Sequence, residues 1–238
     1  MSGQHRLQAS ETASESESTT ASPSPTESGT PSYPVWSTAQ PGSYGGGDPN
    51  GTVFMPAESD TTMSTQDVWF WKPVYSYRSL ADLKSVYLAT VGQNSQLLLN
   101  IAPNATGLVP DEAVAIYSQF GAWVQSCYGA GIELASTSGS GLSMTIALPF
   151  SQIVDRVVLQ EDQSGGEQVW AYSIEVQDGG GPAPWQLVGT GSAVGHKRIH
   201  VLSAGATSMT SLRVNATAVA PGFATVAWAF IAVYAPCS

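Results

Sequence analysis

Two acidic residues, Glu58 and Asp60, are the first candidates for chemistry in this sequence. They follow an apolar run at 52–55, which we expect to form a buried strand limited by Pro56. In an extended chain, residues two positions apart point the same way and lie about 6 to 7 Å apart. Glycoside hydrolysis uses two carboxylates at roughly such separations. The alternative is that both are loop carboxylates in solvent or bound to nearby amides.

An aromatic cluster follows these acids at Trp69, Phe70 and Trp71. Exposed rings beside carboxylates suit sugar binding, because the apolar face of a pyranose packs on an aromatic ring. The alternative is that these rings belong to the core, where most tryptophan surface is buried.

Metal and cofactor chemistry finds little support in the sequence. His196 and His200 would face one side of a strand but lie about 13 Å apart, too far to bind one metal ion. No glycine-rich phosphate loop follows a strand at the required spacing, and no serine or cysteine nucleophile motif is present. We therefore expect no metal and no cofactor.

Charge and hydropathy exclude two classes of partner. Eight Lys and Arg face eighteen Asp and Glu, for a net charge of −10, which is the opposite of a nucleic-acid footprint. The one basic pair, Lys197 and Arg198, is expected to bind acids such as Glu161 or Asp162. The longest apolar run, 226–235, is about half the length needed to span a bilayer. We expect neither a nucleic-acid nor a membrane partner.

Two cysteines and three sequons bear on the compartment. Cys127 and Cys237 either form one disulfide or remain free. Asn50, Asn104 and Asn215 each begin an Asn-x-Thr acceptor pattern, which mildly favours the secretory pathway. Residues 1–10 nevertheless show no apolar segment of a signal peptide.

The elements that would position these residues fall into three parts. Residues 1–40 are expected to be a disordered, low-complexity tail, because they offer almost nothing apolar to bury. Residues 41–131 alternate: the strand at 52–55, a helix from Ser79 that ends before Gly92, a strand at 96–101 and a helix opening at 110. This alternation predicts parallel strands with crossover helices. The buried stripe of the last helix is expected at Val114, Tyr117, Phe120, Val124 and Cys127.

From residue 142 onward, short strand-like segments are separated by Gly and Ser turns and show no helical periodicity. About seven such segments over 142–238 predict a β-sandwich, with the boundary between the halves near 131–141. The expected strands are 142–148, 154–159, 169–176, 185–188, 197–202, 211–216 and 225–234. The fold class is therefore α/β followed by all-β.

Several of these segments resemble a known family. The motifs FMPAESDTTMSTQDVWFWKP at 54–73, LKSVYLATVGQNSQLLLNIAPNATGLVP at 83–110, VDRVVLQED at 154–162 and GTGSAVGHKRI at 189–199 resemble the C-terminal half of α-L-fucosidases of glycoside hydrolase family 29, in the plant-like and bacterial branch. The resemblance covers roughly residues 48–238.

The resemblance implies an irregular (β/α) TIM-like barrel followed by a galactose-binding-like, jelly-roll β-sandwich. It implies retaining hydrolysis that releases L-fucose from oligosaccharides or glycoproteins, with an Asp nucleophile, a Glu acid/base and no metal. The substrate would be a fucosylated glycan. Full-length relatives would be secreted, apoplastic, lysosomal or vacuolar, whereas the localisation and oligomeric state of this chain stay open.

The family's catalytic motifs do not carry over completely. Its nucleophile lies in a Trp-x-Asp-Gly-Ala type motif and its acid/base, in this branch, in Trp-x-Gly-Asn-Glu; neither occurs here. Glu58 corresponds to a substrate-binding carboxylate or, as in the other branch, to an acid/base. Trp69 and Trp71 match a loop that lines the sugar pocket, and Asn100 would shape its floor.

The two βα units expected at 41–131 are about a quarter of a barrel. The expectation is a C-terminal fragment that is inactive alone, arising from a truncated gene model or a true short isoform. The alternative function is a non-catalytic carbohydrate-binding or purely structural β-sandwich.

Overall fold

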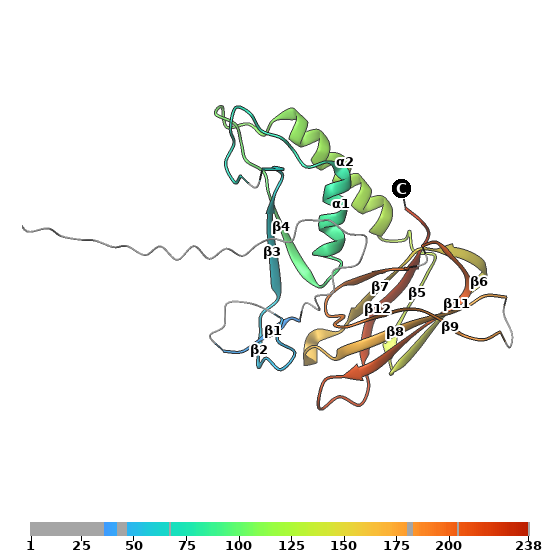
Figure 1. Cartoon of the computed structure of the whole chain (residues 1–238). Helices are drawn as coiled ribbons and strands as arrows, with labels where there is room; N and C mark the ends of the chain where they lie inside the picture. The colour runs from blue at the N-terminus through green and yellow to red at the C-terminus, as the bar shows by residue number, and fades with distance from the viewer. Residues whose placement is uncertain (1–35, 42–46, 67, 180–182, 204, 238) are drawn as a thin grey trace, which may run out of the picture.

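Figure 1 shows the computed structural model, which describes residues 36–41, 47–66, 68–179, 183–203 and 205–237. Most of the tail expected at 1–40 lies outside these residues. Its last part is structured, because β1 (Thr38–Ala39) pairs antiparallel with β2 (Val53–Phe54). Gly51 permits this pairing, since a Cβ there would overlap the backbone of Ala39.

The alternating segment forms two parallel strands, β3 (Ala57–Thr62) and β4 (Ser95–Asn100), joined through helix α1 (Leu80–Ala89). The strand predicted at 52–55 was misplaced, because only the short β2 forms there and the parallel strand begins after Pro56. The sequence of β3, AESDTT, contains a single apolar residue, Ala57. A strand of this type does not show the continuous apolar run that is typical of a parallel strand buried on both faces.

Both predicted helices are present. Ser79 caps α1 through a reciprocal capping box, in which the Asp82 backbone N–H donates to Ser79 Oγ (3.1 Å) and the Ser79 N–H donates to Asp82 Oδ2 (2.9 Å). This pair satisfies two backbone donors at the helix start. Helix α2 (Asp111–Tyr128) follows Pro110 and has two acids in its first turn, where they complement the helix dipole.

The predicted buried stripe of α2 was partly wrong. Val114 and Tyr117 are 48% and 45% exposed, whereas Ala113 and Trp123 are buried beside the correctly predicted Phe120 and Cys127. Both patterns fit a helical repeat of 3.6 residues, and the layer beneath the helix decides which one is buried.

The second half forms two four-stranded antiparallel sheets that pack face to face (Figure 1). The first sheet has the order β10-β7-β12-β5, and the second has the order β6-β11-β8-β9. Apolar side chains from both sheets fill one core between them. The strands are β5 (Ala135–Ser140), β6 (Ser143–Val154), β7 (Arg156–Glu161), β8 (Val169–Gln177), β9 (Gln186–Gly191), β10 (Arg198–Val201), β11 (Thr207–Val219) and β12 (Ala227–Tyr234), with a short 3-10 turn η1 at Gln163–Gly165.

Strand β5 is the element that the sequence did not reveal. Its residues, ASTSGS, are small and polar, and they form an edge strand beside β12. The strand lies in the stretch 131–141 that we interpreted as a boundary, so the first sheet begins at Ala135 rather than at 142. Small polar residues are common on edges, where a long apolar strand would invite pairing with other chains.

The outer face of the first sheet packs against α1 and α2. Val158, Ile199 and Ala232 point out of the sheet into an apolar cluster with helix residues. Tyr87 of α1 meets Trp123 of α2 in this cluster, edge to face, with 5.7 Å between ring centroids. The sandwich therefore covers the face of the helices that would otherwise be exposed.

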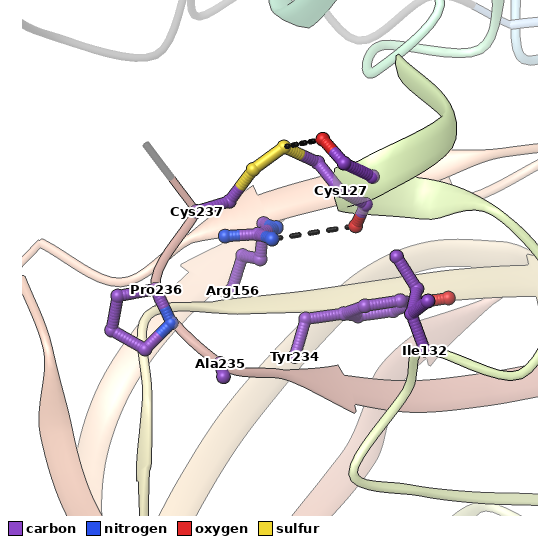
Figure 2. Close-up of a pocket in the computed structure, with 8 residues that line it drawn as sticks. Cys127, Ile132, Arg156, Tyr234, Ala235, Pro236 and Cys237 are labelled. Atoms are coloured by element: carbon purple, nitrogen blue, oxygen red, sulfur yellow. Dashed lines mark hydrogen bonds between the residues drawn. A yellow bond between two sulfur atoms is a disulfide. The ribbon is translucent and has the colours of Figure 1, made fainter. Parts of the chain in front are cut away.

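A disulfide joins the end of α2 to the end of the described chain. Cys127 and Cys237 are paired across a sequence separation of 110 residues, which answers the question that the sequence left open. Figure 2 shows Arg156 beneath this bond, where its Nη2 donates to the carbonyl oxygen of Cys127 at 3.3 Å. Arg156 is also paired with Asp155 at 2.6 Å and lies 5.1 Å from the ring centroid of Tyr128.

Removal of the disulfide should destabilise the protein. A cross-link that closes a loop of this length restricts the unfolded chain, so the double variant C127A/C237A should lose about 2–4 kcal/mol of unfolding free energy. Urea denaturation of the variant, beside the parent with and without a reducing agent, measures the loss. An unchanged midpoint in both comparisons would show that the bond adds no stability.

Candidate functional site

A loop that carries the aromatic cluster is fixed at the carboxyl ends of β3 and β4. We call residues 63–78 the aromatic loop. Asn100, the last residue of β4, donates from Nδ2 to the carbonyl oxygen of Trp69 at 2.9 Å. Thr62, the last residue of β3, donates from Oγ1 to the carbonyl oxygen of Val68 at 3.0 Å. The ends of two neighbouring parallel strands thus hold the middle of the loop.

The base of the aromatic loop is held by its own backbone and by Arg78. The Thr65 N–H donates to the carbonyl oxygen of Ser76 at 3.0 Å, and the Arg78 N–H donates to that of Met63 at 2.7 Å. The Arg78 side chain then reaches back from Nε to the carbonyl oxygen of Thr62 at 2.8 Å. These bonds hold the two ends of a connection that is longer than most loops.

The rings of the loop divide between solvent and packing. Trp69 and Phe70 are 46% and 84% exposed, and Trp71 is half-buried. Exposed large aromatics in a fixed loop are typical of a binding surface. Among the interpretations that the sequence left open, burial of Trp69 in the core is therefore wrong.

Glu58 and Asp60 lie within β3 rather than beyond its end. Both are exposed, and they share a face with Gln96 and Leu98, their partners in the parallel register. The opposite face carries Leu97 and Leu99, which pack on the helix cluster. The two acids therefore point away from the helices, the direction that is the interior in a (β/α) barrel.

The structure does not bring all the predicted site residues together. Trp69 and Asn100 are joined directly by the hydrogen bond described above. Glu58 lies four residues before the carboxyl end of β3, about 13 Å along the strand, whereas Asp60 lies about 7 Å from that end. Of the two acids, Asp60 is the nearer to the aromatic loop.

A buried polar junction, which was not predicted from the sequence, joins the β1 segment, the turn before β4 and the sandwich. Glu167, which is 8% exposed, accepts from the Ser37 backbone N–H at 2.7 Å and from Asn94 Nδ2 at 3.1 Å. Burial raises the pKa of this carboxyl to about 7, and the nearby Glu161 adds to the rise, while the Ser37 hydrogen bond opposes it. The residues that meet here are 130 and 73 positions apart in the sequence. The sequence therefore gives no local signal for this contact.

Glu161 is the second buried carboxylate of the junction. It accepts backbone N–H groups of Gly195 (2.6 Å), Gln168 (2.6 Å) and Val169 (3.0 Å). Burial raises the pKa of Glu161, and these three donors oppose the shift. Glu161 thus accepts backbone N–H groups of the surrounding chain, and among the described residues it forms no ion pair with a basic side chain.

The expected pairing of Lys197 and Arg198 with Glu161 or Asp162 was wrong. Lys197 donates to the Tyr87 hydroxyl at 3.1 Å and lies over two tyrosine rings of the helix cluster. Arg198 points into the sandwich, where its Nε donates to the Tyr172 hydroxyl at 3.2 Å. Lys197 immediately precedes β10 and Arg198 is its first residue, so the alternation of an extended chain directs the two cations to opposite faces of the sheet.

Comparison with known proteins adds to this geometry. A model of the α-L-fucosidase family matches residues 37–129. The chain is 25% identical to α-L-fucosidase 1 of Arabidopsis thaliana over 185 residues, which is 64% of this chain and 36% of that protein. A Bacteroides thetaiotaomicron structure, provisionally assigned as an α-L-fucosidase, superposes with a TM-score of 0.77 at 29% identity, covering 86% of this chain and 48% of the other. The chain resembles the C-terminal portion of a family 29 α-L-fucosidase.

The likeness to family 29 fucosidases extends through both halves of the chain. A Ruminococcus gnavus family 29 fucosidase, solved in complex with fucose, superposes over 87% of this chain and 48% of its own with a TM-score of 0.72. Because the identity is 18%, this superposition shows a common fold and nothing more. The chain spans about a third of the length of the curated fucosidases that it matches. No described helix is long and apolar enough to cross a membrane.

Removal of the Asn100 amide should release the aromatic loop. In N100A the Trp69 carbonyl loses its donor, so we expect faster amide hydrogen exchange at residues 66–71 with unchanged protection in the sandwich core. The matched control is Q96A, which changes an exposed residue of the same strand. Equal exchange in N100A and Q96A would show that Asn100 does not hold the loop.

Glu167 should make stability fall as pH rises. Because its pKa of about 7 in the folded state exceeds the ordinary 4.5, the folded protein binds the extra proton between these values. This contribution is complete below pH 4.5 and is lost as pH rises through 7.

The variant E167Q should therefore gain stability relative to the parent as pH rises from 4.5 to 8, on the order of 1–3 kcal/mol. The difference in unfolding free energy between variant and parent isolates this group from other titrations, and the exposed E112Q serves as the control. A difference that stays constant across this range would contradict the assignment.

Proposed function

We propose that the carboxyl ends of β3 and β4, together with the aromatic loop, form part of the fucose-binding site of a retaining α-L-fucosidase. The observation that carries the proposal is the hydrogen bond from Asn100 to the Trp69 backbone. This bond holds the backbone of Trp69, whose side chain is 46% exposed, beside the end of β4. It therefore supports a site at the strand ends, where barrel enzymes bind their substrates. Trp69 and Trp71 would contact the apolar face of the sugar, and Asn100 would act by positioning Trp69.

The acids of β3 would complete the polar side of this site. A sugar site needs a few polar groups to fix the hydroxyls of its ligand, and Glu58 and Asp60 point to the barrel side of the sheet. Asp60 is the nearer to the aromatic loop and is the better placed to bind a sugar hydroxyl. Glu58, deeper in the strand, would bind substrate only from the interior of a larger barrel.

Hydrolysis would require a further carboxylate. Retention of configuration needs a nucleophile and an acid/base about 5 Å apart across the scissile bond, and the sequence contains no Trp-x-Asp-Gly-Ala motif. We therefore propose that residues 1–238 bind fucose but do not turn over fucosides without an Asp nucleophile from elsewhere in the enzyme.

The sandwich is proposed as a brace rather than a lectin. Its first sheet is covered by the helices of the barrel part, and a disulfide and the Glu167 junction tie the two together. We expect links of this kind in a domain that holds the strands and helices of the first half in place. The same disulfide favours an oxidising compartment for the protein, which agrees with the secreted or vacuolar relatives that the family implies.

Fucose titration with the variant W69A tests the binding proposal. Loss of the ring should weaken binding of L-fucose about 2- to 10-fold by isothermal calorimetry, the range expected for one aromatic contact. The control is F150A, which removes an exposed ring from the sandwich. Equal affinities of W69A and F150A, or no fucose binding by the folded parent, would contradict the proposed site.

Turnover is tested separately with an aryl α-L-fucoside. The 238-residue chain should release no phenol above background. Turnover by this chain would refute the need for an outside nucleophile while leaving the binding site intact.

A further inference from the structure

The three Asn-x-Thr sequons lie in three different structural settings. Asn50 is in a turn before β2, Asn104 is in the connection between β4 and α2, and Asn215 is inside β11. An oligosaccharide is transferred to the amide nitrogen of asparagine, so the setting of Nδ2 decides which of them suits a glycan.

Asn104 is half-buried and begins an exposed turn. Its Oδ1 accepts from the Thr106 N–H (2.9 Å), the Thr106 hydroxyl (2.7 Å) and the Leu108 N–H (3.1 Å). These bonds occupy the oxygen of the amide and leave Nδ2 without a hydrogen bond to any described residue. The four residues after Asn104 are all exposed, so a glycan would extend into solvent without displacing packed side chains.

Asn50 is more exposed than Asn104. Both Asn50 and Thr52 are exposed, and the local hydrogen bonds of Asn50 are made by its backbone: its N–H donates to Asp48 Oδ1 at 2.8 Å, and its carbonyl accepts from Gln40 at 3.1 Å. In the described part of the chain its side chain makes no hydrogen bond that a glycan would break.

Asn215 is held on both sides within the second sheet. Its Nδ2 donates to Glu175 Oε2 at 2.7 Å and to Ser173 Oγ at 3.3 Å, and its Oδ1 accepts from Ser143 Oγ at 2.7 Å. Glu175 also binds Arg213 at 2.7 Å. A glycan on Asn215 would remove one N–H donor from this network and place a bulky group between β6 and β8.

We propose that Asn50 and Asn104 are N-glycan acceptors and that Asn215 stays unmodified once the sandwich has formed. The donor is an oligosaccharide linked through a diphosphate to a lipid. The Asn Nδ2 forms a bond to the anomeric carbon of the first sugar and loses a proton to a base of the transferase. The bond from that carbon to the diphosphate oxygen breaks, and the lipid diphosphate leaves with the electron pair.

The test is secretion of the full chain, behind a cleavable leader, from a eukaryotic cell with this transferase. Intact mass before and after endoglycosidase treatment counts the glycans, and glycopeptide mapping locates them. N50Q and N104Q should each lose one glycan, and N50Q/N104Q should lose both. T217A removes the third sequon without touching Asn215 and should leave the mass of glycan unchanged.

Two further measurements distinguish loss of a glycan from loss of folding. T106S should keep the glycan on Asn104, because the sequon and the hydroxyl are both retained, whereas T106A should lose it. Non-reducing electrophoresis reports the Cys127–Cys237 bond, so occupancy is read on folded chains, including any retained inside the cell. A glycan on Asn215 in such chains, or unmodified Asn50 and Asn104, would overturn the proposal.

Discussion

The structure depends on the packing of α1 and α2 against the outer face of the first sheet. Two parallel strands and two helices do not form a closed core by themselves. Here Tyr87, Trp123 and their neighbours are buried because Val158, Ile199 and Ala232 cover them from the sandwich. The packed helices in turn support Leu97 and Leu99 of β4. The position of the aromatic loop at the end of β4 follows from this contact between layers.

Two links, one covalent and one made of hydrogen bonds, reinforce that contact at separate places. The disulfide joins the end of α2 to the segment after β12, while Glu167 of the sandwich binds the backbone before β1 and the side chain before β4. The two links differ in what weakens them. The disulfide responds to reduction, whereas the Glu167 link responds to pH and is stronger under acidic conditions.

Local signals in the sequence were enough for the helices and for most of the sandwich. The Ser79–Asp82 capping box and the residues Pro110-Asp111-Glu112 mark the two helix starts without reference to the rest of the fold. The failures occurred where the environment decides the outcome. The elements packed against them decide whether the polar segment at β3 and the small residues at β5 form strands. They also decide which face of α2 is buried.

The same distinction holds for the site. Aromatic residues near acids could be found from residue type and spacing, and the exposure of Trp69 agrees with that hypothesis. The hydrogen bond that brings Asn100 to Trp69 joins residues 31 positions apart, and no spacing rule predicts it. The distance of Glu58 from the loop could not be predicted either, because it depends on where β3 ends.

The most direct test of the central claim is an NMR titration of the indole N–H signals of the protein with L-fucose. If the aromatic loop binds the sugar, the signals of Trp69 and Trp71 should shift in a saturable way, while those of the buried Trp123 and Trp228 stay in place. Shifts confined to the sandwich, or none in a well-dispersed spectrum, would contradict the claim that the carboxyl ends of β3 and β4 carry a fucose site.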